Sequence, residues 1–407
     1  MCDSDYSSAC EEEWSEYAMA DGLTTNYSLY DENGTCIPFS EAFELTAIDA
    51  PPVQITFGIL YSFIWIFSIT SNSLVLFVAV VTILGRRGRA QLTGRRFLIS
   101  PDTNRRNSEH RRKMIETAVQ QRTASFSVRT IFVISLACSD LLTGLTSLPV
   151  TAFNIFTHQW LLGRFLCRAI GFMQAFAIFQ SSFTFSFIAI DRYLVVAYPD
   201  TEIITYRAAR FAMLFMAILA GLLAAPMFVF VDTIETPGLC GEFCVEVWPE
   251  PADIGLPFHP QRFYSVFILV LQYGLPAALT TVCYLLIAAL LRKRHRRRLS
   301  SWCKSTCERR LNARRRRMNR MMSVMVLGYV LAWSPFNALN LLRDFDLFPY
   351  LFDTRLFSVL FASSHLIAMT TLVLNPVIYT WFNQWIRDAV FGLFRKCAQR
   401  SHSRDAV

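Results

Sequence analysis

Seven long runs of apolar residues alternate along the chain with segments that are polar and rich in charge. Each run is long enough to cross about 30 Å of hydrocarbon, which takes roughly 20 helical residues. A backbone in lipid must satisfy its own hydrogen bonds, so each run is predicted to be a helix. The pattern therefore predicts an all-α membrane protein, a seven-transmembrane helix bundle, with spans near 55–84, 128–152, 164–196, 208–231, 262–292, 318–343 and 355–381.

A short amphipathic segment follows the last span. From Trp381 to Phe394, large apolar side chains recur on one side of a helix and charged side chains on another, which is typical of a helix lying on the membrane surface. Cys397 lies at its end, where a palmitoyl chain would strengthen anchoring. The chain is thus divided into an acidic N-terminal segment (1–54), a seven-span domain (55–381) and an amphipathic helix with a tail (382–407).

Charge predicts the orientation of the bundle. The first fifty residues hold twelve acidic side chains and no Lys or Arg, and basic residues begin at Arg86. Because Lys and Arg stay on the cytoplasmic side, the N-terminus is predicted to be extracellular in a multi-pass protein of the plasma membrane. Orientation and attraction to anionic membrane lipid then explain the net charge of +8, so no nucleic-acid partner is expected. The acidic outer side favours cationic ligands.

The predicted outer segments also carry candidates for modification. Asn26 and Asn33 each begin an Asn-X-Ser/Thr triplet and are predicted glycosylation sites. Stable disulfides are expected only on this side of the membrane, among Cys2, Cys10, Cys36, Cys167, Cys240 and Cys244.

The predicted first inner loop, 85–127, is unusually long. It is basic and poor in large apolar residues, a composition typical of a segment without regular structure. It is either a regulatory insert, with Ser100 or Ser108 open to phosphorylation, or a retained segment without a role.

Ionisable groups inside the spans are candidate functional sites because burying a charge in lipid is costly. Asp140 lies in the middle of the second span, with Asn72, Ser181 and Asn375 as its expected partners. One interpretation is a protonated acid that serves packing alone. The other is a cation site, for sodium, whose occupancy differs between two arrangements of the bundle.

Two further patterns concern the inner half of the spans. Asp191-Arg192-Tyr193 ends the third span, where the guanidinium can pair with its neighbour or extend to the interface. Pro335, two residues after Trp333, and Pro376 lie within the sixth and seventh spans. A proline there removes a backbone donor and bends the helix. The bend is either a tolerated kink or a pivot about which the inner half of the helix moves outward.

In order and spacing, these residues resemble the rhodopsin-like (class A) G-protein-coupled receptors over about residues 55–396. The resemblance implies a receptor that transmits ligand binding to a heterotrimeric G protein, with the Asp191–Tyr193 triplet at the coupling end. One departure is Arg315, which stands where some members have an acidic partner for Arg192. The matching residues are Asn72, Asp140, Cys167, Asp191-Arg192-Tyr193, Trp333-Ser334-Pro335 and Asn375-Pro376-Val377-Ile378-Tyr379.

Within that class, the segments 244–249, 269–273 and 365–369 resemble the neuropeptide Y and neuropeptide F receptors. This resemblance implies a peptide ligand with an amidated arginine-aromatic end. It also implies a bond from Cys167 to Cys244, with Cys240 as an alternative partner of Cys167 or a partner of Cys2, Cys10 or Cys36. A tyrosine of the group is replaced by Asn154. The implied ligand positions are Thr151, Gln174, Gln272, Asn340, Asp344 and His365.

The chemistry of these positions suits such a ligand. Asn340 and Asp344 are four residues apart and share a helix face, and a carboxylate can bind arginine through two hydrogen bonds. Gln174 and Gln272 can donate hydrogen bonds to, and accept them from, the terminal amide of such a ligand. The alternative for Asp344 is a solvated loop acid, and for His365 a packed polar residue.

Other functions fit the sequence less well. A class A receptor for another ligand fits the same fold. A channel or transporter would be expected to show internal repeats or paired broken helices, and none is evident. A retinal-based light sensor needs a lysine in the last span, and 355–381 has none. No nucleophile and base grouping appears, so neither an enzyme nor a cofactor other than sodium is expected.

Overall fold

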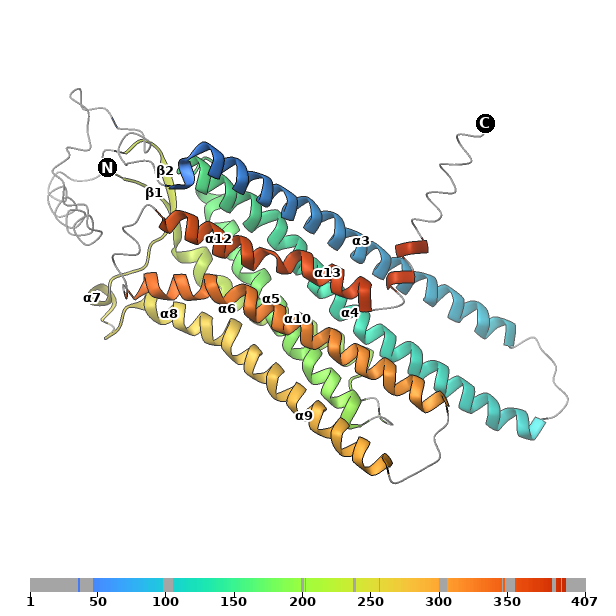
Figure 1. The fold of residues 1–407 in the computed structure, drawn as a ribbon. Coiled ribbons are helices and arrows are strands. Elements are labelled where there is room, and N and C mark those ends of the chain that lie inside the picture. Colours follow the sequence, from blue (N-terminus) through green and yellow to red (C-terminus); the bar gives the residue numbers. More distant parts are fainter. Residues whose placement is uncertain are drawn as a thin grey trace, which may run out of the picture.

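Seven helices of the computed structural model are long and apolar enough to cross a membrane, as predicted, and they pack side by side in one bundle (Figure 1). The structure describes residues 47–97, 105–198, 203–236, 239–255, 257–299, 306–345 and 356–382, with Cys36, Thr201, Leu347 and the helical pieces 386–388 and 390–392. The spans are Pro51–Val81, Thr130–Thr157, Gly163–Ala197, Tyr206–Phe230, Pro260–Lys293, Ser323–Asp344 and Phe357–Ile378.

The spans belong to ten named elements. The first four are α3 (Pro51–Phe97), α4 (Arg105–Thr157), α5 (Gly163–Ala197) and α6 (Tyr206–Phe230). The fifth combines α8 (Pro260–Ile268), the π-helical turn η2 (Leu269–Gly274) and α9 (Leu275–Leu299). The sixth is part of α10 (Thr306–Asp344), and the seventh joins α12 (Phe357–Met369) to α13 (Thr371–Phe382).

The surface of the bundle is apolar along its length. Ile59, Phe211 and Leu222 are more than half exposed, and many other large apolar side chains are exposed with them. Such a surface would be unfavourable in water and is expected of helices that face hydrocarbon. Polar side chains instead collect between the helices, where Asn72, Ser182 and His365 are fully buried.

One end of the bundle carries two short strands, and we call it the hairpin end. Strands β1 (Val231–Glu235) and β2 (Glu242–Glu246) pair antiparallel, with Val231 opposite Glu246. Trp248 follows β2 and packs between two rings, 4.4 Å from Phe230 and 5.0 Å from Tyr264 between centroids. These contacts fix the strands against the fourth and fifth spans.

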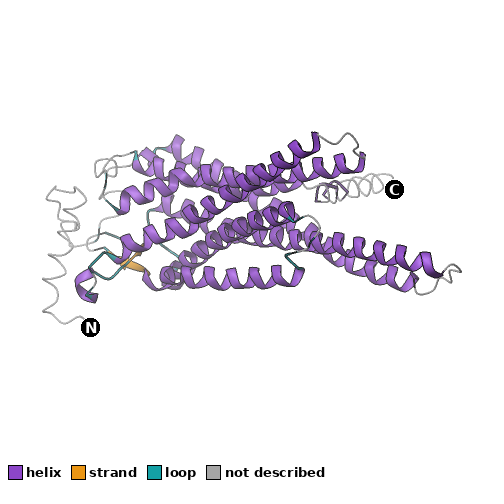
Figure 2. Cartoon of the chain, turned by 90° about the horizontal axis from the view of Figure 1, so that it is seen from below, coloured by secondary structure: helices purple, strands orange, loops and turns teal. Residues whose placement is uncertain are grey.

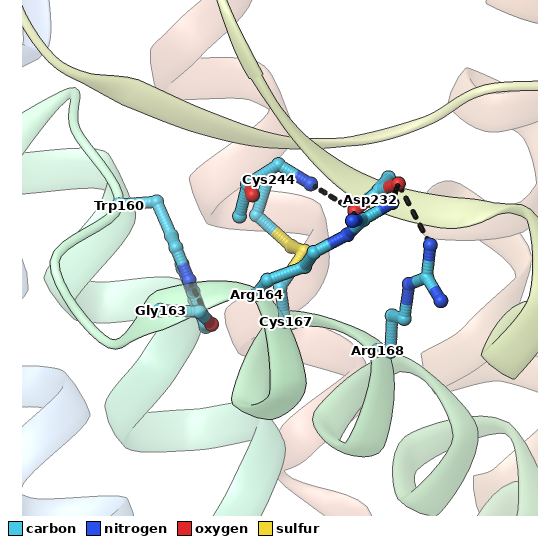
Figure 3. The surroundings of a disulfide bond; sticks show 8 residues. Trp160, Gly163, Arg164, Cys167, Arg168, Asp232 and Cys244 are labelled. Carbon is cyan, nitrogen blue, oxygen red and sulfur yellow. Dashed lines mark hydrogen bonds and ion pairs between the residues drawn. A yellow bond between two sulfur atoms is a disulfide. The ribbon is translucent and has the colours of Figure 1, made fainter.

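Two arginines and a disulfide fix the same strands to α5 (Figure 3). Asp232 accepts hydrogen bonds of 2.6 Å from Arg164 Nε and 2.7 Å from Arg168 Nη2. The Arg164 guanidinium, with Arg168 and the Thr233 N–H, holds the pKa of the Asp232 carboxyl well below its usual range. The cluster therefore stays charged across any physiological pH.

The sequence prediction for 85–127 is wrong where the structure describes the segment. Residues 85–97 continue α3 and residues 105–127 begin α4 as helix, and the two helices run beyond the rest of the bundle (Figures 1 and 2). These stretches lack proline and contain Ala, Gln, Leu, Met, Lys and Arg, which favour helix. Each extends an existing span, so no new helix nucleus is required. Composition alone does not contain this attachment to a preformed helix.

The piece after the last span is helical where it is described, at 386–388 and 390–392. Ile386 and Val390 are buried and join the main apolar cluster, whereas Phe391 is exposed. This confirms a short helix after the seventh span. The predicted glycosylation sites, Asn26 and Asn33, and the predicted palmitoylation site, Cys397, lie outside the described residues.

Candidate functional site

The predicted ligand residues come from five of the seven spans. Thr151 lies on α4, Gln174 on α5, Gln272 in η2, Asn340 and Asp344 on α10, and His365 on α12. Thr151 and Asp344 lie within the last two turns before the hairpin end of their helices, and Gln174 lies two turns beyond Cys167. Side chains on facing helices at one end of a bundle are a common way to build a ligand site.

Two carboxylates mark the rim of this site. The Asp344 side chain is 8% exposed, with Oδ1 3.5 Å from Arg343 Nε. Glu246, at the end of β2, accepts a 2.9 Å hydrogen bond from Trp248 Nε1. Glu246 stands at the exposed end of β2. Desolvation by its neighbours raises the pKa of its carboxyl, Trp248 and Arg343 lower that pKa, and Asp344 raises it. Glu246 therefore lies within electrostatic reach of both Arg343 and Asp344.

Sequence reasoning did not select Glu246. It is two residues after Cys244, and the disulfide to Cys167 draws that strand over the end of α5. An acid so close to the bonded cysteine was the signal that could have identified it. The Cys167–Cys244 bond itself is present as predicted, and Cys240 is bonded to Cys36, one of the alternatives left open.

His365 is packed inside the bundle and is 1% exposed. Its Nδ1 lies 3.0 Å from Tyr61 Oη and its Nε2 3.2 Å from Ser147 Oγ, so both ring nitrogens have partners on other spans. Its ring also packs 5.5 Å from that of Phe336. This geometry favours the packing alternative for His365 over direct ligand contact.

The packing role leads to a stability prediction. Tyr61→Phe removes the hydroxyl that contacts His365 and Ala362 O, so the free energy of unfolding should fall by about 1–2 kcal/mol. Ser147→Ala should lower the free energy of unfolding by less in the Tyr61→Phe variant than in the unmodified protein, because Tyr61 and Ser147 both contact the imidazole of His365. Thermal unfolding of the detergent-solubilised protein measures both effects. Unchanged stability together with lost peptide binding would instead place His365 in the ligand site.

A π-helical turn shapes the middle of the fifth span. Pro276 has no N–H to bond the carbonyl of Gln272, four residues earlier. Ser182 Oγ of α5 donates to that carbonyl. Next to it, Tyr273 Oη donates 2.9 Å to Val330 O and lies 2.6 Å from Ser334 Oγ. The turn thus links the third, fifth and sixth spans directly below Gln272.

Trp333 occupies the core beside this link. It is 4% exposed, and its ring packs 5.8 Å from Tyr329 and 6.2 Å from Phe336. Its indole N–H has no hydrogen-bond partner within the described part of the chain. Pro335, two residues later, interrupts the hydrogen bonds of α10. A large buried ring next to a helix break is suited to move with it.

Asp140 meets one of its three expected partners. Asn375 Nδ2 donates to Asp140 Oδ2 at 3.0 Å, whereas Ser181 makes no hydrogen bond with Asp140 among the described residues. Asn72 Nδ2 instead donates 3.0 Å to Leu372 O. Pro376 lacks the N–H that would otherwise bond that carbonyl, so Asn72 satisfies the break in α13. The Tyr379 side chain lies outside the described residues.

At the opposite end of the bundle, Arg192 and Asp191 form an ion pair and are 3% and 4% exposed. Tyr193 follows on the same turn of α5 and is half-buried. The Arg315 side chain lies outside the described residues. The predicted triplet is therefore held in the interior between the helix ends rather than in solvent.

Comparison with known proteins places this arrangement in a family. The sequence model described as 7 transmembrane receptor (rhodopsin family) matches residues 114–379. Neuropeptide receptor 3 of Caenorhabditis elegans is 34% identical over 367 residues, 88% of this chain and 84% of that protein. The Neuropeptide F receptor of Drosophila melanogaster is 29% identical over 70% of this chain and 59% of its own length. Neuropeptide Y receptor type 2 of Mus musculus is 29% identical over 67% of this chain and 70% of its own length. The chain belongs to the rhodopsin family of seven-transmembrane receptors.

Proposed function

We propose that the chain is a plasma-membrane receptor for an amidated neuropeptide with an arginine-aromatic end, and that its hairpin end faces the outside. Relatives from three animals are named as receptors for neuropeptides, two of them for neuropeptides F and Y. The observation that carries the proposal is the pair of carboxylates, Asp344 and Glu246, at the rim of the candidate site. Two acids with one partly exposed arginine beside Asp344 suit a cationic ligand.

In this proposal the ligand guanidinium binds Asp344 and displaces Arg343, whose side chain is 49% exposed and free to turn toward solvent. Glu246 contributes a second acceptor from β2. Gln174 and Gln272 satisfy the terminal amide, which both donates and accepts, and Asn340 and Thr151 complete the polar contacts. His365 shapes the site through its neighbours.

Signal transmission follows from the helix breaks. Ligand binding to Gln272 and Asn340 favours a different arrangement of the fifth and sixth spans, in which Pro335 and Trp333 move together. This rearrangement reaches the seventh span through Asp140 and its partner Asn375, and through Pro376 and Tyr379. The Asp191-Arg192-Tyr193 triplet then contacts a heterotrimeric G protein. The ligand acts by binding one arrangement more tightly than the other, without chemistry.

A sodium ion at Asp140 fits the same scheme. The buried oxygens of Asn72 and Ser68 have no hydrogen-bond partner within the described part of the chain, and Ser68 Oγ lies against Gly144, one turn from Asp140. Together with the Asp140 carboxylate, these oxygens would offer an all-oxygen set, which hard cations prefer. Sodium would supply the countercharge that keeps Asp140 ionised in the resting arrangement.

A comparison of amidated and free-acid peptides tests the ligand proposal. Fluorescent peptides ending in Arg-Phe or Arg-Tyr are applied to membranes that contain the receptor. The amidated forms should bind at least about tenfold more tightly, because a free carboxylate has no N–H to donate to the side-chain oxygens of Gln174 and Gln272 and must be desolvated as a charge. Equal binding of the two forms would contradict the assignment of Gln174 and Gln272.

A further inference from the structure

The helices α3 and α4 extend past the end of the bundle that lies opposite the hairpin end (Figures 1 and 2). Residues 85–97 and 105–127 form this extension, which we call the arm. At 1.5 Å per residue, its two helices are about 20 Å and about 35 Å long. In both views they run beside each other and away from the other spans. The arm therefore projects from the end of the bundle that carries Asp191 and Arg192.

The arm is strongly basic along its length. Its two helices contain eleven Lys or Arg and two acidic residues, Glu109 and Glu116. Seven of the basic residues lie in the outer halves of the two helices, with Glu109 as the one acid among them on these helices. We call these seven residues the distal cations: Arg95, Arg96, Arg105, Arg106, Arg111, Arg112 and Lys113.

The distance of the distal cations from the membrane decides what they can interact with. Taking residues 84 and 128 as the ends of the apolar runs, the distal cations lie about 16–35 Å beyond the hydrocarbon at 1.5 Å per residue. Polar headgroups extend only about 6 Å past the hydrocarbon on each side. The field of an anionic leaflet decays within a Debye length, about 8 Å at physiological salt. Attraction to the membrane therefore does not account for the distal cations.

Orientation of the bundle does not require the distal cations either. Arg86, Arg87 and Arg89 directly follow the first apolar run, and basic residues close to a span are the ones that set its topology. The charge at the far end of the arm is thus left for a partner in the cytoplasm.

A cytoplasmic protein bound at the coupling end lies beside the arm. The proposed function places a heterotrimeric G protein at Asp191-Arg192-Tyr193, on the last turns of α5. A folded domain of about 300 residues has a radius of gyration of about 19 Å. A domain of that size, docked at the helix ends, extends alongside helices that project about 20 Å and about 35 Å.

Charge selects the surface that the arm can bind. A second copy of the chain would bring the same positive charge, and like charges across an interface oppose binding. An acidic protein surface is attracted over a distance, which raises the rate of association. The arm is therefore suited to an acidic protein surface that is carried to the same end of the bundle.

We propose that the arm is a second docking surface for the G protein, on which the distal cations contact an acidic flank of the G protein bound at Arg192. This inference rests on the proposed function. The arm and the Asp191-Arg192-Tyr193 triplet then act as two linked sites, and binding at one raises the effective concentration of the G protein at the other. The arm holds the partner, whereas the triplet and the helix ends carry the signal.

The test is a variant in which all seven distal cations are changed to Gln, which favours helix about as well as Arg and Lys do. The receptor is placed in nanodiscs of phosphatidylcholine and saturated with an amidated peptide ending in Arg-Phe. Nucleotide exchange is measured against the concentration of a G protein that the unmodified receptor activates. The KM for the G protein should rise about tenfold at an ionic strength of about 0.05 M and about threefold at about 0.15 M, with kcat unchanged.

A charge-conserving variant supplies the matched control. The six arginines among the distal cations are changed to Lys, which keeps the net charge of the arm. Because long-range attraction depends on charge, the KM should stay within about twofold of that of the unmodified receptor. Peptide affinity should stay within about threefold in both variants, because the arm lies at the end opposite the candidate ligand site.

The outcomes separate this inference from the proposed function. An unchanged KM in the glutamine variant, while the unmodified receptor drives exchange, would overturn the docking role and leave the receptor function standing. A rise in KM that occurs only in nanodiscs containing phosphatidylserine would assign the arm to the leaflet and would overturn it as well. A fall in kcat alone would mean that the arm alters the receptor instead of holding its partner. If the unmodified receptor accelerates exchange on no G protein, the proposed function itself fails.

Discussion

Asp344→Ala should raise the peptide concentration for half-maximal receptor activation by about 30-fold or more. Removing one partner of a partly buried charge pair costs on the order of 2–5 kcal/mol, and each 1.4 kcal/mol is a factor of about ten. The Asp344 side chain is 8% exposed, so water cannot fully replace it. The measurement is a concentration–response curve for G-protein activation, with surface expression checked in parallel.

Glu235→Ala is the matched control for that variant. Glu235 ends β1 and is exposed, so its loss changes the net charge of the hairpin end by the same amount. We expect a shift of less than about threefold, since exposed charges contribute little at physiological salt. Equal shifts in the two variants would mean that the ligand senses only the general field and would remove Asp344 from the site.

Asp140→Ala should abolish most agonist-driven signalling and leave peptide affinity nearly intact. The variant removes the acceptor of the 3.0 Å hydrogen bond from Asn375, which joins the second span to the seventh beside Pro376. A buried donor left without a partner costs about 1–3 kcal/mol in any arrangement that keeps it buried. That is enough to shift a two-state equilibrium by tenfold or more.

The measurement for Asp140 pairs equilibrium peptide binding with G-protein activation in the same membranes. Ser181→Ala serves as the control, because Ser181 is a buried polar residue of α5 that makes no hydrogen bond with Asp140 among the described residues. Its signalling should stay within about threefold of the unmodified receptor. A parallel loss of binding and signalling in Asp140→Ala, at normal expression, would contradict a role in transmission.

The spans and two long-range pairs, Cys167–Cys244 and Asp140–Asn375, could be predicted from the sequence. Apolar runs define membrane helices because lipid leaves the backbone no alternative. The Asn375–Asp140 hydrogen bond was expected because a carboxylate buried in lipid needs a partner. The same reasoning predicts that Asn72 bonds Asp140. Asn72 instead donates to the carbonyl of Leu372, which Pro376 leaves without a backbone donor.

Other features depended on three-dimensional contacts that no local pattern contains. Glu246 became a candidate only when the disulfide placed β2 over the helix ends. The Cys36–Cys240 bond was one of several pairings that spacing alone cannot separate. His365 has its partners on α3 and α4, hundreds of residues away, so its packing role could not be chosen over ligand contact. The helical continuation of α3 and α4 depended on the spans that precede and follow it.

Nucleotide exchange on a purified heterotrimeric G protein tests the central claim most directly. The receptor is reconstituted in lipid nanodiscs, and exchange is followed before and after amidated peptides ending in Arg-Phe or Arg-Tyr are added. The account predicts that at least one peptide accelerates exchange by about tenfold or more, as for a ligand that shifts a two-state receptor, and that Arg192→Ala removes the acceleration without removing peptide binding. Acceleration that persists in Arg192→Ala, or no acceleration by any peptide that binds, would contradict it.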